Sequence, residues 1–266
     1  MSQNPRQTKP TKRPKKTPRG QRRVHNIENS GQNIAVKSAL KIKEFHPLTD
    51  NQALVFDAYD DGRHLFLHGY AGTGKSFLAL YLSLQEILDG DSEYNKVIII
   101  RSTVSSRDQG FLPGKPAEKA EMYELPYHQI CNELFGRGDA YIVLKNKGLI
   151  QFESTSFLRG LTLSNAIVIF DEAQNASAGE LNTAMTRIGH DSKMIFCGDI
   201  RQNDLVNSKS KEKSGVSDFM KVIKRLNLFT FIEFGIPDIV RSNLVRDYII
   251  ARAELEDANV INTLLG

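Results

Sequence analysis

An eight-residue stretch rich in glycine has the clearest chemical purpose in this sequence: Gly69-Tyr70-Ala71-Gly72-Thr73-Gly74-Lys75-Ser76. It matches the phosphate-binding pattern G-x-x-x-x-G-K-[ST] at every fixed position. Glycine permits the positive φ angles and the close approach that let several main-chain N–H groups point at one phosphate. Lys75 would add a charge for the β- and γ-phosphates, and Ser76 a hydroxyl for Mg²⁺. We therefore expect this loop, together with Phe77, to bind ATP.

The second group with a chemical purpose is a pair of acids at the end of an apolar run. Residues 166–170 read Ala-Ile-Val-Ile-Phe, and Asp171 and Glu172 follow. An apolar strand that carries acids at its tip is typical of the second half of a nucleotide-hydrolysis site. Asp171 could hold Mg²⁺, usually through water. Glu172 could polarise the attacking water as a general base. The plainer alternative is a pair of solvated acids.

Four further polar residues are weaker candidates. Gln52 could pair with an adenine edge, because its amide both donates and accepts, although a glutamine on a helix surface is the usual case. Gln202 could sense the γ-phosphate or orient water. Arg187 and Arg241 could stabilise charge at the γ-phosphoryl group, in the same chain or from a neighbour, because each is expected on the strand-end side of its element. A structural salt bridge is the alternative for either arginine.

The phosphate loop lies between elements that could position it. Residues 64–68 are a short apolar run that predicts a buried strand, and residues 77–88 predict a helix. The order strand, glycine loop, helix is the context that the motif requires, and it makes a chance glycine-rich turn the weaker interpretation. Further strands are expected at 96–101, within 142–152, at 166–170, at 192–199 and at 229–234.

The remaining segments predict helices around these strands. Thr49 or Asp50 could cap a helix through residues 53–59. Residues 118–135 are expected to be mostly helical, with an interruption near Pro126. A closing helix is expected to begin at Asp238, with Pro237 near its first turn. Strands that alternate with helices predict an α/β fold with a mostly parallel central sheet.

The charge of the chain is unevenly distributed. The chain has 266 residues and a formal net charge of +4. Residues 1–23 contain nine of the 35 Lys and Arg residues and none of the 31 Asp and Glu residues, so the rest of the chain has a net charge of −5. We expect residues 1–33 to be a disordered basic arm and residues 34–266 to form the ATPase domain. The arm could bind nucleic acid through phosphates or serve only as a solubilising tail, and a transit peptide is the weaker reading.

Composition also indicates the cellular compartment in which the protein is expected. No run approaches the roughly 18 apolar residues of a membrane helix, and no signal-peptide pattern is present. Cys131 and Cys197 lie far apart and in no metal-ligand spacing, which favours buried free thiols in a reducing compartment. We therefore expect a cytoplasmic protein that has no membrane partner.

Several motifs occur in one order along residues 45–250, and together they resemble the PhoH family of phosphate-loop ATPases, which are similar to the core of superfamily-one helicases. They are Leu48-Thr49-x-x-Gln52, the phosphate loop, Gly110-Phe111-Leu112-Pro113-Gly114, Leu158-Arg159-Gly160, Asp171-Glu172-Ala173-Gln174-Asn175, Thr186-Arg187-Ile188-Gly189, Gly198-Asp199-x-x-Gln202-x-Asp204 and Asp238-Ile239-Val240-Arg241. The phosphate loop alone is common to many families, whereas the combination is specific.

The resemblance implies a three-layer RecA-like P-loop NTPase domain that hydrolyses ATP with Mg²⁺. It also implies a homo-oligomeric ring, with a hexamer favoured, and RNA or single-stranded DNA as the partner. It places Gln52 near adenine and Gln202 near the γ-phosphate. The sequence departs from the family at Lys115, where an acid is usual, and at Leu161, where a second arginine is usual. Both departures bear on the nucleic-acid partner, or on the coupling of hydrolysis to that partner, more than on ATP hydrolysis itself.

Three functions fit these residues. The first is an ATPase that couples hydrolysis to movement on, or remodelling of, RNA or single-stranded DNA. The second is a nucleotide-switched binding protein that hydrolyses ATP slowly and thereby switches its binding to a protein partner. A small-molecule kinase is the least favoured, since the sequence shows no acceptor pocket or lid signature, and Asp171 and Glu172 suit water activation better.

Overall fold

A parallel sheet of six strands forms the centre of the molecule. The computed structural model describes residues 40–89, 91–102, 116–199 and 215–265. The strands are β1 (His64–Gly69), β2 (Lys96–Arg101), β3 (Ile150–Ser154), β4 (Ala166–Asp171), β5 (Lys193–Gly198) and β6 (Phe229–Phe234). They lie in the order β3-β2-β4-β5-β1-β6, and every neighbouring pair is parallel. The predicted parallel α/β fold is confirmed.

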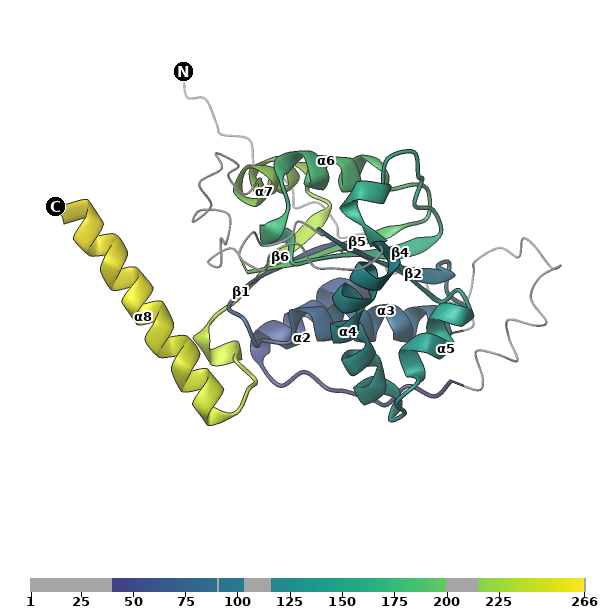
Figure 1. Cartoon of the computed structure of the whole chain (residues 1–266), viewed down its shortest axis with the longest axis horizontal. Helices are drawn as coiled ribbons and strands as arrows, with labels where there is room; N and C mark the ends of the chain where they lie inside the picture. Colours follow the sequence, from purple (N-terminus) through teal and green to yellow (C-terminus); the bar gives the residue numbers. More distant parts are fainter. Residues whose placement is uncertain (1–39, 90, 103–115, 200–214, 266) are drawn as a thin grey trace, which may run out of the picture.

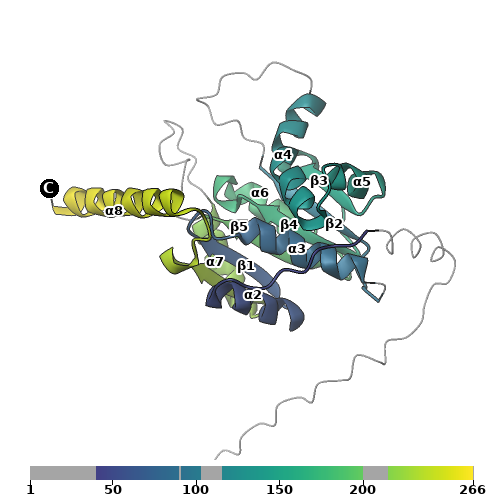
Figure 2. The same cartoon turned by 90° about the horizontal axis from the view of Figure 1, so that it is seen from below.

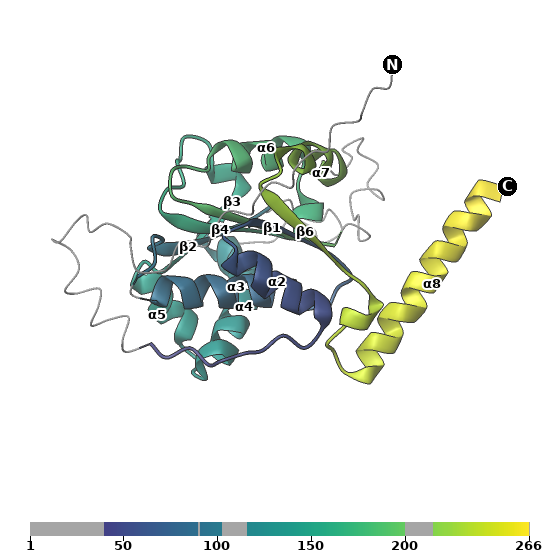
Figure 3. The ribbon, with the colours of Figure 1, turned by 180° about the vertical axis from the view of Figure 1, so that it is seen from behind.

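Helices cover both faces of the sheet and complete three layers (Figure 1). One face carries α2 (Asp50–Asp60), α3 (Lys75–Leu88), α4 (Pro116–Phe135) and α5 (Ala140–Asn146). The other face carries α6 (Ala178–Thr186) and α7 (Val216–Ile223), as the view from behind also shows (Figure 3). Short 3₁₀ turns follow four elements: η2 (Thr155–Phe157), η3 (Ala173–Asn175), η4 (Lys224–Leu226) and η5 (Ile236–Asp238).

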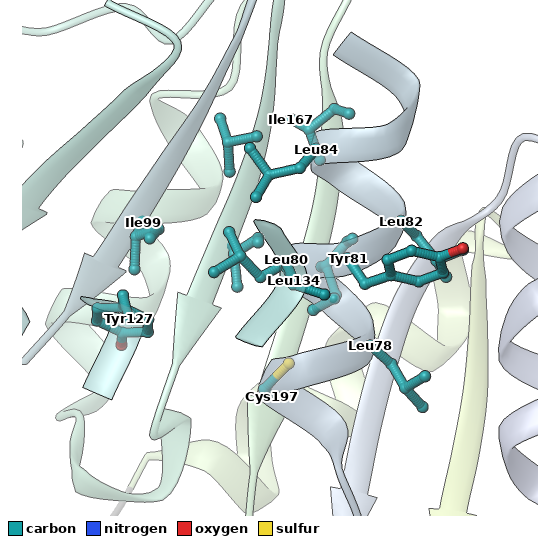
Figure 4. Packing of buried hydrophobic residues seen from close by; sticks show 14 of the residues in the cluster. Leu78, Leu80, Tyr81, Leu82, Leu84, Ile99, Tyr127, Leu134, Ile167 and Cys197 are labelled. Carbon is teal, nitrogen blue, oxygen red and sulfur yellow. The ribbon is translucent and has the colours of Figure 1, made fainter. Parts of the chain in front are cut away.

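Two apolar layers hold the sheet and the helices together, because the central strands are buried on both faces. Leu65 and Leu67 of β1 face the α3 layer, whereas Phe66 between them faces the α6 layer. In the first layer, Leu80 and Leu84 of α3 pack among residues of the sheet and of α4 (Figure 4). This two-sided burial explains why the strands read as continuous apolar runs instead of alternating ones.

The strand order decides which loops can meet. All strands are parallel, so their carboxyl ends lie at one edge of the sheet, which we call the carboxyl edge; their first residues lie at the opposite amino edge. Strand β5 separates β1, which leads into the phosphate loop, from β4, which ends in Asp171. The loop and the acid pair therefore flank the end of β5, where ligands bind in open parallel sheets.

Helix boundaries differ from the sequence expectations in two places. Helix α4 continues through Pro126, although proline lacks the N–H that the helix would use there. The closing helix α8 (Asn243–Leu265) begins five residues later than expected, because the Asp238 carboxylate accepts the N–H of Gly235 and closes η5. Helices α5, α6 and α7 were not foreseen. Thr49, and not Asp50, caps α2 by accepting the N–H of Gln52 at 3.3 Å.

Helix α8 projects away from the sheet, which is clearest in the view from below (Figure 2). No helix in the described ranges combines the length and apolarity needed to cross a bilayer. Cys131 and Cys197 are both buried free thiols, as expected. The basic arm at residues 1–33, the Gly110–Gly114 motif and Gln202 lie outside the described residues, so their expected roles stay predictions.

Candidate functional site

The phosphate loop connects β1 to α3 at the carboxyl edge and has the backbone that its glycines were expected to supply. Gly69, Gly72 and Gly74 have φ angles of 119°, 75° and 84°. A Cβ at Gly69 would lie 2.1 Å from the Phe234 carbonyl oxygen of β6, so no larger residue fits there. The N–H of Val240 donates to the Gly72 carbonyl at 3.0 Å and fixes the middle of the loop.

The Lys75 ammonium is folded back onto the loop that precedes it. Its Nζ donates to the carbonyl oxygens of Gly69 at 3.0 Å and Tyr70 at 2.6 Å, and lies 3.3 Å from the Thr73 hydroxyl. Burial lowers the pKa of Lys75 below its usual value, and the acids nearby, Asp199 first among them, oppose that shift. The charge therefore points into the loop, where a phosphate would meet it.

The two residues expected to hold Mg²⁺ are in direct contact. The Ser76 hydroxyl at the start of α3 donates to Asp171 Oδ1 at 2.7 Å, although the two residues come from different strand–helix units. The second oxygen, Oδ2, accepts the hydroxyl of Tyr127 from α4 at 2.8 Å. A hydroxyl and a carboxylate side by side are the oxygen ligands that Mg²⁺ prefers, so these residues fit the ion.

Glu172 is set apart from Asp171 by its backbone. Its φ of 53° is left-handed, a conformation that is uncommon for a residue other than glycine. The Gln174 Nε2 donates to Glu172 Oε2 at 2.5 Å, while Gln174 Oε1 accepts the N–H of Asp199 at 3.0 Å. Burial, and then the neighbouring Asp171 charge, raise the pKa of Glu172 above its usual value. A carboxylate with a raised pKa accepts a proton more readily, as a general base must.

Gln52 lies against the phosphate loop with its amide in use. Its Nε2 donates to the Thr73 carbonyl at 3.1 Å, and its Oε1 accepts the N–H of Leu48 at 2.8 Å. The side chain is buried. The surface position that sequence reasoning held to be the usual case is therefore wrong. Gln52 joins the start of α2 to the loop, and its contact with adenine remains a prediction.

A cavity of about 930 Å³ opens beside the loop, between the start of α2 and the carboxyl end of β6. Leu48, Tyr70 and Pro237 supply apolar lining, and Asn51 and Asp238 supply polar lining. The Asn51 Nδ2 donates to Asp238 Oδ2 at 2.7 Å, which ties the two walls together. The cavity borders Gly69 and Tyr70, so a ligand in it would reach the phosphate loop directly.

The two candidate arginines lie at opposite edges of the sheet. A Cβ added to Gly72 would come within 2.8 Å of Arg241 Cγ, so Arg241 lies over the phosphate loop of its own chain. Arg187 follows α6, and its carbonyl accepts the N–H of Leu163, three residues before β4 begins. The expectation that Arg187 lies on the strand-end side is therefore wrong, because α6 runs back to the amino edge.

Three residues at the site were missed by sequence reasoning. Tyr127 and Gln174 hold the two acids, as described above. Arg101, the last residue of β2, lies beside Asp171 in the strand register, and its charge lowers the pKa of Glu172 against the larger effects that raise it. A basic residue at the end of an apolar strand was a usable signal for Arg101. No local pattern marks Tyr127 as a partner of Asp171.

Comparison with known proteins identifies relatives over most of the chain. The model of a family described as PhoH-like protein matches residues 44–252. A PhoH-like protein of Mycobacterium leprae is 31% identical over 218 residues, which are 81% of this chain and 60% of that protein. A PhoH-like protein of Synechocystis is 35% identical over 195 residues, with coverages of 73% and 58%. This chain thus spans about 60% of the length of these relatives.

Among solved structures, the helicase domain of Pyrococcus furiosus Hef matches 71% of this chain and 39% of its own, with a TM-score of 0.39 and 13% identity.

Proposed function

The chain belongs to the PhoH-like protein family. From this premise we propose that it is a P-loop NTPase of helicase-like type and a Mg²⁺-dependent ATPase that acts on RNA or single-stranded DNA. The observation that carries the hydrolytic part is the 2.7 Å contact between Ser76 Oγ and Asp171 Oδ1. It brings the end of the phosphate loop to the acid pair of another strand. A phosphate held by the loop would therefore lie beside Glu172.

The loop residues would bind the triphosphate, including Tyr70, Ala71, Thr73 and Phe77 with the three glycines. Main-chain N–H groups and the start of α3 would face the phosphates. Lys75 would exchange its loop carbonyls for β- and γ-phosphate oxygens. Mg²⁺ held by Ser76 and Asp171 would neutralise charge on those oxygens. We place the base and ribose in the neighbouring 930 Å³ cavity, which Asn51 lines. Gln52 does not line it but bonds to the lining residue Leu48, and we propose that it meets the adenine there.

Glu172 would then act on water. Its carboxylate would take a proton from a water molecule whose oxygen bonds to the γ-phosphorus, while the bond from that phosphorus to the β–γ bridging oxygen breaks. ADP and inorganic phosphate leave, and the proton passes from Glu172 to solvent. Gln174 would keep Glu172 aimed across the end of β5, since it holds both Glu172 and the Asp199 N–H. Gln202 would orient the same water or sense the γ-phosphate.

Assembly completes the proposal. A single domain of this kind cannot enclose ATP between two lobes, so we propose a ring, with six copies favoured, in which a neighbour supplies a further arginine. Arg241 lies over its own loop, whereas Arg187 lies away from it and is the candidate for the neighbour's arginine. Turnover should then disappear on dilution below the assembly concentration. Turnover proportional to concentration down to a proven monomer would contradict the ring.

The rival function is a nucleotide-switched binding protein whose partner is another protein, with slow hydrolysis. The basic arm would bind nucleic acid in the first function and serve as an anchor in the second. The two functions differ in what stimulates turnover, because a nucleic-acid motor hydrolyses faster when its track is present.

The test is ATP turnover with and without single-stranded RNA and single-stranded DNA, at two salt concentrations. The proposal expects Mg²⁺-dependent turnover that either nucleic acid raises, with the stimulation weaker at high salt because phosphate contacts are screened. Turnover that neither strand changes would favour the protein switch. Absence of Mg²⁺-dependent turnover under all conditions would overturn the ATPase itself.

A further inference from the structure

Tyr127 is a buried hydroxyl donor at the candidate metal site that comes from outside the loop and the acid pair. It lies in the middle of α4, and its side chain is 2% exposed. Its ring packs 6.0 Å from that of Phe152 and lies beside Ile99 of β2 in the core (Figure 4). Its hydroxyl leaves this apolar surrounding to donate to Asp171 Oδ2 at 2.8 Å.

The consequence for Asp171 is that both carboxylate oxygens are held, each by a different hydroxyl. Ser76 donates to Oδ1 at 2.7 Å, and Tyr127 donates to Oδ2. Rotation of the carboxylate would break both bonds, and the loss would be costly because Asp171 is 5% exposed and has little access to water. Tyr127 holds the carboxylate from the side opposite Ser76 and so fixes the direction of Oδ1. It thereby also fixes the position of any ion that Asp171 and Ser76 would hold.

We propose that Tyr127 is a positioning residue that orients the Asp171 carboxylate for Mg²⁺ and thereby sets the affinity of the site for the metal. The inference rests on the proposed metal–nucleotide site. Tyr127 does not touch the nucleotide: it acts through Asp171, as outer partners of metal ligands commonly do. Loss of such a partner typically weakens metal affinity about 10- to 100-fold.

A purely structural role would give a different result, and the chain offers a matched control. Tyr141 of α5 is 1% exposed, and its hydroxyl donates to Glu124 Oε2 at 2.8 Å. Glu124 is also bonded to Lys145 at 2.6 Å and is no part of the candidate site. Tyr127→Phe and Tyr141→Phe therefore each remove one buried hydroxyl from one carboxylate, and only the first removal concerns Asp171.

The experiment measures Mn²⁺ as a probe of the Mg²⁺ site, with the free ion followed by electron paramagnetic resonance at saturating ADP. Tyr127→Phe should raise the apparent Mn²⁺ dissociation constant by about tenfold, and Tyr141→Phe should leave it at the wild-type value. Melting temperatures of both variants should fall by similar amounts, because each leaves a buried acceptor with one bond fewer. In ATP turnover, Tyr127→Phe should need more Mg²⁺ for half-maximal rate but approach the wild-type kcat at saturating Mg²⁺.

Two outcomes would overturn the inference while leaving the proposed function intact. One is a Tyr127→Phe variant with wild-type Mn²⁺ affinity. The other is an equal loss of affinity in both variants, which would show a general effect of destabilisation. If the wild-type chain bound no Mn²⁺ in the presence of ADP, that result would instead contradict the proposed metal–nucleotide site, and the inference about Tyr127 would be contradicted as well.

Discussion

The two edges of the sheet each hold a lysine that is shielded from water, Lys193 buried and Lys75 half-buried, and the two lysines are used differently. At the amino edge, Lys193 Nζ donates to the Tyr59 carbonyl at 3.0 Å and lies 3.5 Å from the centre of the Tyr59 ring. At the carboxyl edge, Lys75 Nζ donates to carbonyls of its own loop. Burial lowers the pKa of both lysines. The cost of removing the charge from water therefore does not by itself distinguish a structural lysine from a functional one.

The helices that flank the two lysines do distinguish them. Lys193 meets the last turn of α2, where the helix dipole favours a cation. Lys75 is the first residue of α3, where the dipole disfavours a cation and favours an anion. A half-buried cation at the unfavourable end of a helix is explained when an anionic ligand joins it. The comparison teaches that the position of a lysine relative to a helix end, more than its burial, identifies the lysine that would bind a phosphate.

The largest expected effect comes from replacing the two lysines by methionine, which keeps their length and removes their charge. Lys75→Met should lower ATP turnover by at least about 10²-fold, because phosphate charge loses its partner. Lys193→Met should leave turnover unchanged, and stability should change little, since the Tyr59 carbonyl still accepts the Gly62 N–H. Turnover assays and thermal melting check the pair. Equal loss of turnover in both variants would contradict the distinction between the edges.

A smaller effect is expected from the two arginines, which sharpen the same comparison. Arg241→Ala should weaken ATP binding by about 10- to 100-fold, the value of one charge-assisted contact of about 1.5–3 kcal/mol. Arg187→Ala should leave binding unchanged, because Arg187 lies at the amino edge. Titration of dilute protein with a fluorescent ATP analogue measures both constants within single chains. A weaker constant for Arg187→Ala alone would reverse the assignment.

Much of this architecture could be predicted from local sequence because the central strands are buried on both faces. Their continuous apolar runs, the glycine loop and the acids after β4 each carry a signal within a few residues. Helix α4 was harder. The expected break at Pro126 does not occur, since burial of Tyr127, Cys131 and Leu134 along the helix offsets the loss of one hydrogen bond.

The partners of the acids could not be predicted, because they depend on contacts between distant segments. Tyr127 reaches Asp171 across 44 positions, and the Ser76–Asp171 contact spans 95. The edge on which Arg187 lies depends on the direction of α6, which a motif does not encode. The start of α8 was misplaced for a similar reason: Val240 bonds to Gly72, so the chain crosses the phosphate loop before the helix begins.

The central claim is that the loop holds a triphosphate while Glu172 drives water onto its terminal phosphorus. Glu172→Gln tests it most directly, with ATP affinity and single-turnover hydrolysis measured on the same preparation. We expect ATP affinity close to that of the wild type and hydrolysis slower by about 10²–10⁴-fold, the range for loss of a general base. Unchanged hydrolysis would remove Glu172 from that role and contradict the account.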